Sequence, residues 1–242
     1  QFLAWCFEYA DWKTFGSGFL SRIAVGMDGS CNGLQNFSAM LRDSRGGKAT
    51  NLVPSPLPND IYQMVADRLT AILKDEAEDE QGFRTLWLEH GLTRTLVKRP
   101  VMTLPYGSRQ SSWADFIVSD YLLDGRWPEL DKSLYEKAAT YLSRRLAHAI
   151  SDVVVKAREA MDWLQSGSTA ILRSGYDRIS WITPSGFPVT QVYWEQDEHR
   201  INTKLCGNAK LRLRKESDIP KKSRHRNGIA PNFVHSLDAS HL

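Results

Sequence analysis

Apolar residues recur at helical spacing in several long segments of the chain. Leu34, Phe37 and Leu41 follow the i, i+3, i+7 pattern of one helix face. A second segment, residues 61–73, repeats the pattern at Ile61, Val65, Leu69, Ile72 and Leu73. Residues 131–164 continue it over a longer stretch, with apolar positions at Leu142, Leu146, Ile150, Val153, Val154 and Ala157. The pattern predicts a chain that is mostly helical.

Three segments are instead typical of strands. One is the alternation of Leu211 and Leu213 with Arg212 and Arg214, which predicts a strand with the arginines facing outward. Residues 23–27 are a short apolar run that ends at the turn-forming pair Asp28 and Gly29, which predicts a buried strand. Residues 179–194 alternate around Pro184-Ser-Gly186 and predict a β-hairpin. Strands combined with dominant helices predict an α-rich fold of the α/β class.

A stripe of polar and apolar side chains marks residues 93–107. Arg94, Lys98, Met102 and Tyr106 recur every fourth residue and therefore share one helix face. Lys98 and Tyr106 would lie about 12 Å apart at 1.5 Å per residue, roughly the length of a nucleoside triphosphate from outer phosphates to sugar. We call these four residues the cation–tyrosine stripe. The same spacing also fits an ordinary amphipathic helix with a solvated basic face.

Two prolines interrupt this helical segment. Pro100 cannot donate a backbone hydrogen bond, so we expect a kink or a break into two pieces near residues 96–99. Pro105 repeats the problem just before Tyr106 and Gly107, so the helix is expected to end or turn there.

Asp28 is a candidate metal ligand because it follows a predicted strand and precedes a predicted helix. Its carboxylate, together with the Gly29 carbonyl, could coordinate a hard divalent cation such as Mg²⁺. An ordinary Asp-Gly turn explains the pair equally simply.

Charged residues are unevenly distributed along the chain. The 242 residues carry a net charge of +3, with 42% hydrophobic and 24% charged residues, which is typical of a globular protein. Residues 204–226 are strongly basic, and this basic segment favours contact with a phosphate backbone, although a solubilising loop would have the same composition. Its candidate nucleic-acid contacts are Arg212, Arg214, Lys221, Lys222 and Arg224. No apolar run approaches the length of a membrane span, so no membrane partner is expected.

The C-terminal segment predicts a helix that opens at Pro231, a residue favoured in the first helical turn. Asn232, His235 and Asp238 fall three apart on one face. His235 is a candidate to hydrogen-bond a base, a sugar or the Tyr106 hydroxyl, and a purely structural histidine is the alternative.

Three motifs in order resemble the phage-type single-subunit DNA-directed RNA polymerases and the related DNA polymerase I family. The pattern Arg94-x3-Lys98-x7-Tyr106-Gly107 is similar to their fingers-helix motif. DGSCNGLQ at residues 28–35 is similar to the RNA polymerase form of the metal-binding palm motif, and GIAPNFVHSLDASHL at residues 228–242 to the returning palm helix. The similarity runs through the whole chain.

The resemblance implies a role for each candidate residue. Asp28 and Gly29 would hold Mg²⁺, with two ions in the complete enzyme. Arg94 and Lys98 would bind the triphosphate, and Lys98 would also protonate the leaving pyrophosphate. The remaining substrate contacts implied are Met102, Tyr106, Gly107 and His235. DNA polymerases of this group carry a bulky glutamate where Gly33 stands, so an open space for a ribose is expected at Gly33.

The resemblance also implies a right-hand polymerase core. Residues 1–55 would be the first part of the palm, residues 56–228 a mainly helical fingers subdomain, and residues 229–242 the returning palm helix. The family's second metal-binding aspartate lies downstream of that helix, so the chain is expected to be an incomplete piece that does not polymerise alone. Its partners would be a DNA template, NTPs, nascent RNA and the missing polymerase segments or a complementing chain.

Two other functions stay open at this point. A DNA polymerase of the polymerase I family would share the stripe, but Gly33 and the DGSC signature favour RNA synthesis. A non-catalytic nucleic-acid-binding module would use only the basic segment. The resemblance to phage enzymes suggests action in the cytoplasm of a bacterial host.

Overall fold

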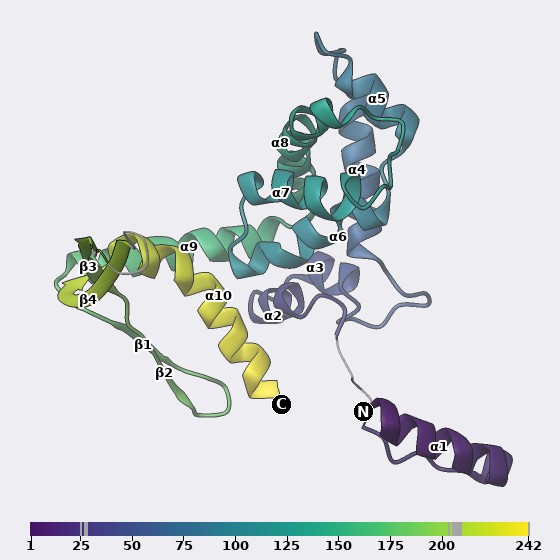
Figure 1. Ribbon diagram of the computed structural model, residues 1–242, viewed down its shortest axis with the longest axis horizontal. Coiled ribbons are helices and arrows are strands. Elements are labelled where there is room, and N and C mark those ends of the chain that lie inside the picture. The colour runs from purple at the N-terminus through teal and green to yellow at the C-terminus, as the bar shows by residue number, and fades with distance from the viewer. Residues whose placement is uncertain (25, 27–28, 203, 205–209, 242) are drawn as a thin grey trace.

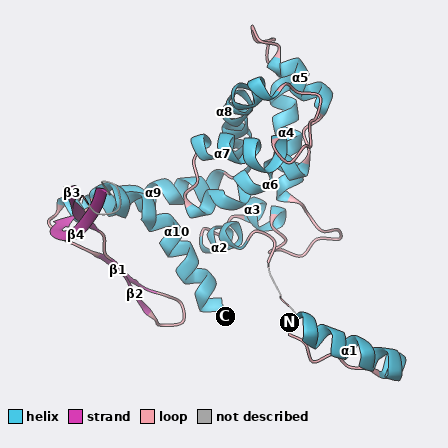
Figure 2. Cartoon of the chain, viewed as in Figure 1, coloured by secondary structure: helices cyan, strands magenta, loops and turns pink. Residues whose placement is uncertain are grey.

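The computed structural model describes residues 1–24, 26, 29–202, 204 and 210–241. Helices dominate it, and two small antiparallel hairpins complete the fold, as Figure 2 shows. This arrangement confirms the predicted α-rich mixture of helices and strands. None of the described helices is long and apolar enough to cross a membrane.

A helical body surrounds the main core at one end of the molecule (Figure 1). Its helices are α4 (Ile61–Asp75), α5 (Phe83–His90), α6 (Arg94–Thr103), α7 (Gln110–Ile117) and α8 (Tyr135–Val153). Helix α8 packs against α4 and α7, and α6 packs against α4. The predicted apolar faces are buried here, because Leu69, Leu142 and Leu146 are each 0% exposed. Short turns of other helix types connect the body: η2 (Leu104–Tyr106), η3 (Val118–Leu122) and η4 (Lys132–Leu134).

A second group of helices continues from this body. It comprises α2 (Asn32–Met40), α3 (Ser44–Ala49), α9 (Val155–Arg173) and α10 (Lys222–His241). Helix α10 packs along α9 and against α2 and η2. The long helical segment predicted over residues 131–164 is therefore two helices, divided at Val154 and extended to Arg173.

Two hairpins follow the far end of α9, and the first of them extends beside α10 (Figure 1). Strand β1 (Ile179–Ile182) pairs with β2 (Pro188–Gln191), which confirms the predicted hairpin. Strand β3 (Trp194–Asn202) pairs with β4 (Lys210–Pro220). The strand predicted over residues 23–27 is not observed at Ile23, Ala24 or Gly26, and Val25 and Met27 lie outside the described residues.

The two prolines of the stripe segment have different effects. Helix α6 runs without a break from Arg94 to Thr103 with Pro100 inside it, so of the predicted kink or break, the break is wrong. Pro100 is buried against the core, which stabilises the helix despite the missing backbone donor. At Pro105 the chain changes to the η2 turn and then to Gly107, at φ 85°, as predicted.

Helix α10 begins earlier than the sequence indicated. It starts at Lys222, so Pro231 lies in its interior and not in its first turn. The Asn227 carbonyl, which would accept from the amide of an ordinary residue at position 231, faces Gly107 instead.

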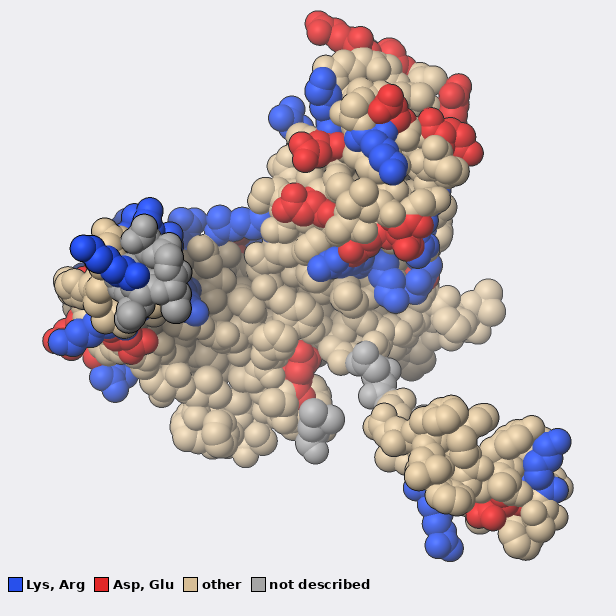
Figure 3. Space-filling view, in the orientation of Figure 1, with Lys and Arg blue, Asp and Glu red and all other residues tan. Residues whose placement is uncertain are grey.

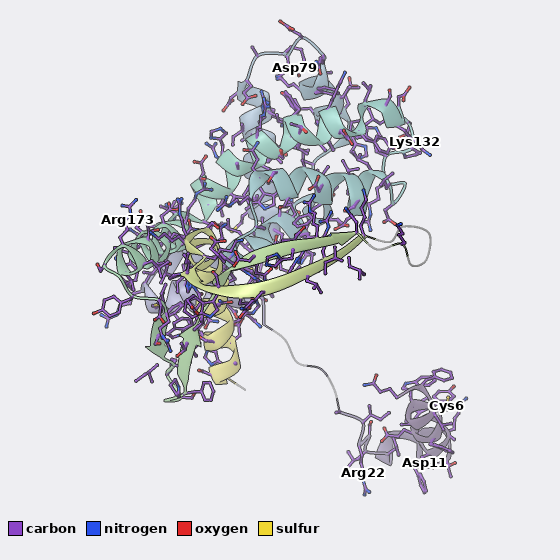
Figure 4. All side chains as sticks on the ribbon, turned by 60° about the vertical axis from the view of Figure 1, so that its left-hand side comes forward. Cys6, Asp11, Arg22, Asp79, Lys132 and Arg173 are labelled. Atoms are coloured by element: carbon purple, nitrogen blue, oxygen red, sulfur yellow. The ribbon has the colours of Figure 1, made fainter. Side chains whose placement is uncertain are left out.

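The N-terminal helix α1 (Phe2–Phe15), followed by η1 (Gly16–Gly18), buries none of its residues. Phe2, Trp5, Tyr9 and Trp12 stack successively along one side of it. Figure 4 shows Cys6, Asp11 and Arg22 on this separate segment, away from the helical body. It contributes nothing to the core described above.

A buried histidine joins α10 to the hairpins. His225 is 0% exposed, and its Nε2 accepts a hydrogen bond from the Tyr193 amide at 3.1 Å. Its Nδ1 lies 3.2 Å from Gln191 Nε2. Burial lowers the pKa of His225 below its ordinary value.

We expect this histidine to make stability depend on pH. The unfolded chain takes up the proton near the ordinary pKa of about 6.5, whereas the folded protein resists it until a lower pH. The free energy of unfolding should therefore fall as the pH drops below about 6.5. Urea unfolding of wild type and His225→Gln at pH 7.5 and 5.0 measures this, and the variant should lose less stability between the two. Equal losses would show that His225 contributes nothing.

Candidate active site

All four residues of the cation–tyrosine stripe line one cavity of about 520 Å³. Helix α6 and η2 form one wall with the stripe. The segment from Gly29 to Asn32 before α2, and Asn59 to Tyr62 at the start of α4, form the others. The helical spacing therefore predicted correctly that these side chains face a common space.

Arg94 is held in place at one end of this cavity. Its Nε donates to the Asp60 carboxylate, and its guanidinium lies over the Tyr62 ring, 5.0 Å from the centroid. Asp60 also accepts from the amides of Tyr62 and Gln63 at the start of α4. Burial opposes the charge of Asp60, but the bonds and charge of Arg94 and these amides outweigh it and lower the pKa of that carboxyl. Arg94 is thus held in a fixed position, with its charge paired to Asp60.

Lys98 lies one helical turn further along the cavity. It is exposed, and within the part of the chain that the structure describes it makes no ion pair. Met102, 39% exposed, follows on the same face. The stripe therefore offers a lysine available to an anion, followed by an apolar surface.

Tyr106 closes the other end and joins three elements. Its hydroxyl donates to Asp238 Oδ2 of α10 at 3.2 Å, and its ring stacks on His235, with centroids 4.6 Å apart and planes at 14°. Asp238 Oδ1 accepts from Asn36 Nδ2 of α2 at 2.6 Å. Burial, and then the Asp238 carboxylate, raise the pKa of Tyr106 to about 12, so the phenol is neutral at physiological pH.

Of the three partners predicted for His235, a base, a sugar or the Tyr106 hydroxyl, the hydroxyl bonds to Asp238 instead, and His235 stacks on the Tyr106 ring. The polar residues predicted on one face of α10 contact two different parts of the protein. Asn232 donates to Gln191 Oε1 and Tyr193 Oη of the hairpin region, whereas His235 and Asp238 face the cavity residue Tyr106.

Gly33 contacts the same tyrosine. A Cβ at this buried position would lie 2.7 Å from Pro105 Cβ and 3.2 Å from Tyr106 Cζ. The open space expected beside Gly33 is therefore filled by these two rings. The missing side chain allows α2 and η2 to approach closely.

Gly107 makes a second close approach. Its φ of 85° is readily available only to glycine, and a Cβ there would meet the Asn227 carbonyl at 3.5 Å and Pro231 Cδ at 3.6 Å. The residue positions the end of the stripe against α10 and does not line the cavity.

The predicted metal site can be described only in part. Asp28 lies outside the described residues. The Gly29 carbonyl accepts from the Cys31 amide at 3.1 Å, and the side-chain oxygens of Asn32 and Gln35 lie close to Gly29. Such an oxygen-rich surface suits a hard cation. Over the described ranges, no group of three or more His, Cys, Asp or Glu side chains could hold a metal ion.

The basic segment forms strand β4 and the start of α10. Arg212 and Arg214 both approach Glu198 of β3, at 3.6 and 3.8 Å. Lys221 pairs with Glu195 at 3.2 Å. Figure 3 shows Lys and Arg side chains gathered around this hairpin.

The last two candidates of the basic segment lie at the start of α10. Arg224 lies over the Tyr193 ring, 4.8 Å from its centroid. Lys222 is exposed at the first position of the helix. All five predicted nucleic-acid residues thus belong to one region, but Arg212 and Arg214 share the carboxylate of Glu198 and Lys221 pairs with Glu195.

Sequence reasoning missed the residues that position the stripe. Asp60 could have been found as an N-cap, because it directly precedes the apolar pattern that begins at Ile61. Asn36 and Cys31 carried no comparable signal. Cys31 is buried in the cavity wall and hydrogen-bonded to Tyr62, and burial raises the pKa of its thiol.

A cavity with two cations at one end and a stacked tyrosine at the other suits a ligand that combines anionic groups with a ring. The comparisons identify the group of proteins in which this site occurs. Residues 1–242 match the family described as DNA-dependent RNA polymerase, and the chain belongs to that family.

Individual relatives agree. The chain is 36% identical to the DNA-directed RNA polymerase of Enterobacteria phage K11 and to T7 RNA polymerase of Escherichia phage T7. It is 32% identical to the mitochondrial DNA-directed RNA polymerase of Mus musculus. Each alignment covers 100% of this chain but only 31%, 32% and 20% of the respective relative. The chain thus spans about a third of the length of the phage relatives.

Proposed function

We propose that the chain is the palm and fingers portion of a DNA-directed RNA polymerase. The complete enzyme would transfer nucleotides from NTPs to an RNA 3′ end, as directed by a DNA template. The observation that carries the proposal is the single cavity lined by Arg94, Lys98, Met102 and Tyr106. The names of the relatives support the same reaction class.

The two ends of the cavity would contact different parts of the nucleotide. Phosphoryl transfer depends on positioning and charge neutralisation more than on covalent help. Arg94, held by Asp60, and the exposed Lys98 would bind the triphosphate, with Lys98 giving a proton to the leaving pyrophosphate. Tyr106 would contact the ribose, because it lines the opposite end of the cavity, and His235, which stacks on the Tyr106 ring, would contact it from beside that ring.

The oxygen-rich surface at Gly29 fits a magnesium site. Asp28 and the Gly29 carbonyl would hold Mg²⁺, which neutralises phosphate charge when bound, and two ions are expected in the complete enzyme. A second aspartate would come from another part of the polymerase.

The proposal extends to the whole enzyme. Residues 1–55 would be palm, residues 56–228 fingers and residues 229–242 the returning palm helix of a right-hand core. DNA template, NTPs, nascent RNA and the other polymerase segments are its partners. The phage relatives support action in the cytoplasm of a bacterial host.

Nucleotide binding by two lysine variants tests the proposal. Titrating the chain with Mg²⁺ and ATP should show binding that weakens about tenfold in Lys98→Ala, the usual scale for loss of a charged hydrogen bond. Lys132→Ala is the control, because Lys132 is also exposed and lies on the helical body (Figure 4) but does not line the cavity. Equal affinity in the two variants would contradict the assignment of the phosphate end.

A further inference from the structure

A second cavity, of about 410 Å³, adjoins the end of the stripe. Three arginines from three different parts of the chain line it: Arg109 just before α7, Arg158 on α9 and Arg226 on α10. One carboxylate, Asp162, lines it with them. The lining charge is therefore strongly positive, and we call this space the arginine cavity.

These arginines have no acidic partner within the described part of the chain. Arg109 Nη2 donates to Asn227 Oδ1 at 2.5 Å, and Arg158 Nη1 donates to Ser151 Oγ at 3.1 Å. Both partners are neutral, so each guanidinium keeps its charge uncompensated and most of its donors unused. By contrast, Arg68, Arg99 and Arg145 elsewhere in the chain each pair with a carboxylate.

The hydrogen bonds to neutral partners hold the guanidinium groups of Arg109 and Arg158 in place. Arg109 is tied through Asn227 to α10, the helix that also carries Arg226, and both arginines line the cavity. Asp162 lies one helical turn after Arg158 on α9, yet the two make no ion pair. Three guanidinium charges that share one cavity with a single carboxylate repel each other, and a bound anion would reduce this repulsion.

We propose that the arginine cavity binds a phosphodiester group of a single polynucleotide strand. This inference rests on the proposed function. The cavity lined by the cation–tyrosine stripe includes Thr103 and Tyr106. The arginine cavity is lined by their neighbours Leu104, Gly107 and Ser108, so the two cavities lie on either side of one turn. A strand held here by its backbone would pass beside the site that receives the incoming nucleotide. Backbone contacts of this kind fix the position of a strand without reading its sequence.

The arginine cavity is separate from the basic side chains of strand β4. Arg212 and Arg214 lie on β4 and share Glu198, whereas the three cavity arginines surround the end of the stripe. Planar guanidinium groups that offer several donors suit phosphate oxygens, and a neighbouring pair can hold one phosphate in a defined orientation.

The test measures binding of a fluorescent single-stranded DNA oligonucleotide by anisotropy. Arg158→Gln and Arg226→Gln should each weaken binding about tenfold at low salt. Each should also reduce the slope of log affinity against log salt by about 0.7, because one phosphate contact is lost. Arg173→Gln is the matched control, since Arg173 is an exposed arginine on the same helix as Arg158, outside the cavity. It should change affinity less than twofold.

A second probe separates the two sources of phosphate. Titration with Mg²⁺ and ATP should give wild-type affinity in Arg158→Gln and Arg226→Gln. If these variants weaken ATP binding but not oligonucleotide binding, the cavity takes nucleotide phosphates and the proposal is wrong. Oligonucleotide binding that matches wild type in affinity and salt slope in both variants would also overturn it. Either result leaves the Lys98→Ala comparison, and so the proposed function, to be judged separately.

Discussion

Replacing Trp87 by alanine should lower the free energy of unfolding by about 3–5 kcal/mol, the usual cost of emptying a large aromatic site in a core. Trp87 is 0% exposed on α5. Its Nε1 donates to the Ala138 carbonyl of α8 at 3.1 Å, and its ring lies 4.7 Å from that of Trp127. The substitution removes the bond and leaves a void between α5 and α8.

Trp163 provides the matched control. It is 73% exposed on α9, so Trp163→Ala should change the unfolding free energy by less than about 0.5 kcal/mol. Urea unfolding followed by circular dichroism measures both variants. If Trp87→Ala costs no more than Trp163→Ala, then α5 is not part of the core that supports α6 and the site.

A single methyl group at Gly33 should disturb the site itself. The Cβ of Gly33→Ala would lie 2.7 Å from Pro105 Cβ, closer than atoms can pack, and 3.2 Å from Tyr106 Cζ, a tight contact. Overpacking of this kind costs about 1–3 kcal/mol. Because the strain falls on η2, the Tyr106 ring must shift, and ATP binding with Mg²⁺ should weaken along with stability.

Gly167→Ala is the matched control, because its expected change in stability is opposite to that of Gly33→Ala. It also lies inside a helix, α9, but a Cβ there meets nothing within 4 Å. Gly167→Ala should therefore stabilise the protein by up to about 1 kcal/mol through helix propensity and leave ATP binding unchanged. Stabilisation by both substitutions would show that α2 and η2 are not in close contact.

The elements that the sequence predicted well are those with strong periodicity. Leu69 and Val65 mark the buried face of α4, and the alternation near Ile179 marks the first hairpin, because burial of a regular apolar face dominates the local choice of structure. The stripe was found for the same reason. Its residues recur every fourth position, and a helix places such residues on one face.

Tertiary contacts decide what the sequence could not show. Pro100 was expected to kink or break α6, but the helix runs on without a break and the proline is buried inside it. Pro231 was expected to begin α10, yet the helix starts nine residues earlier. Asp60 and Asp238 are distant in sequence from the stripe residues they hold, Arg94 and Tyr106, so no local pattern could connect them.

The central claim is that a nucleoside triphosphate binds along the cation–tyrosine stripe. The most direct measurement is photo-crosslinking of the chain with 8-azido-ATP and Mg²⁺, followed by peptide mapping of the label. The account predicts label on peptides that contain residues 94–107 or 29–32, with a lower yield in Lys98→Ala. Label confined to α1 or to the β3–β4 hairpin, with a yield that Lys98→Ala leaves unchanged, would contradict it.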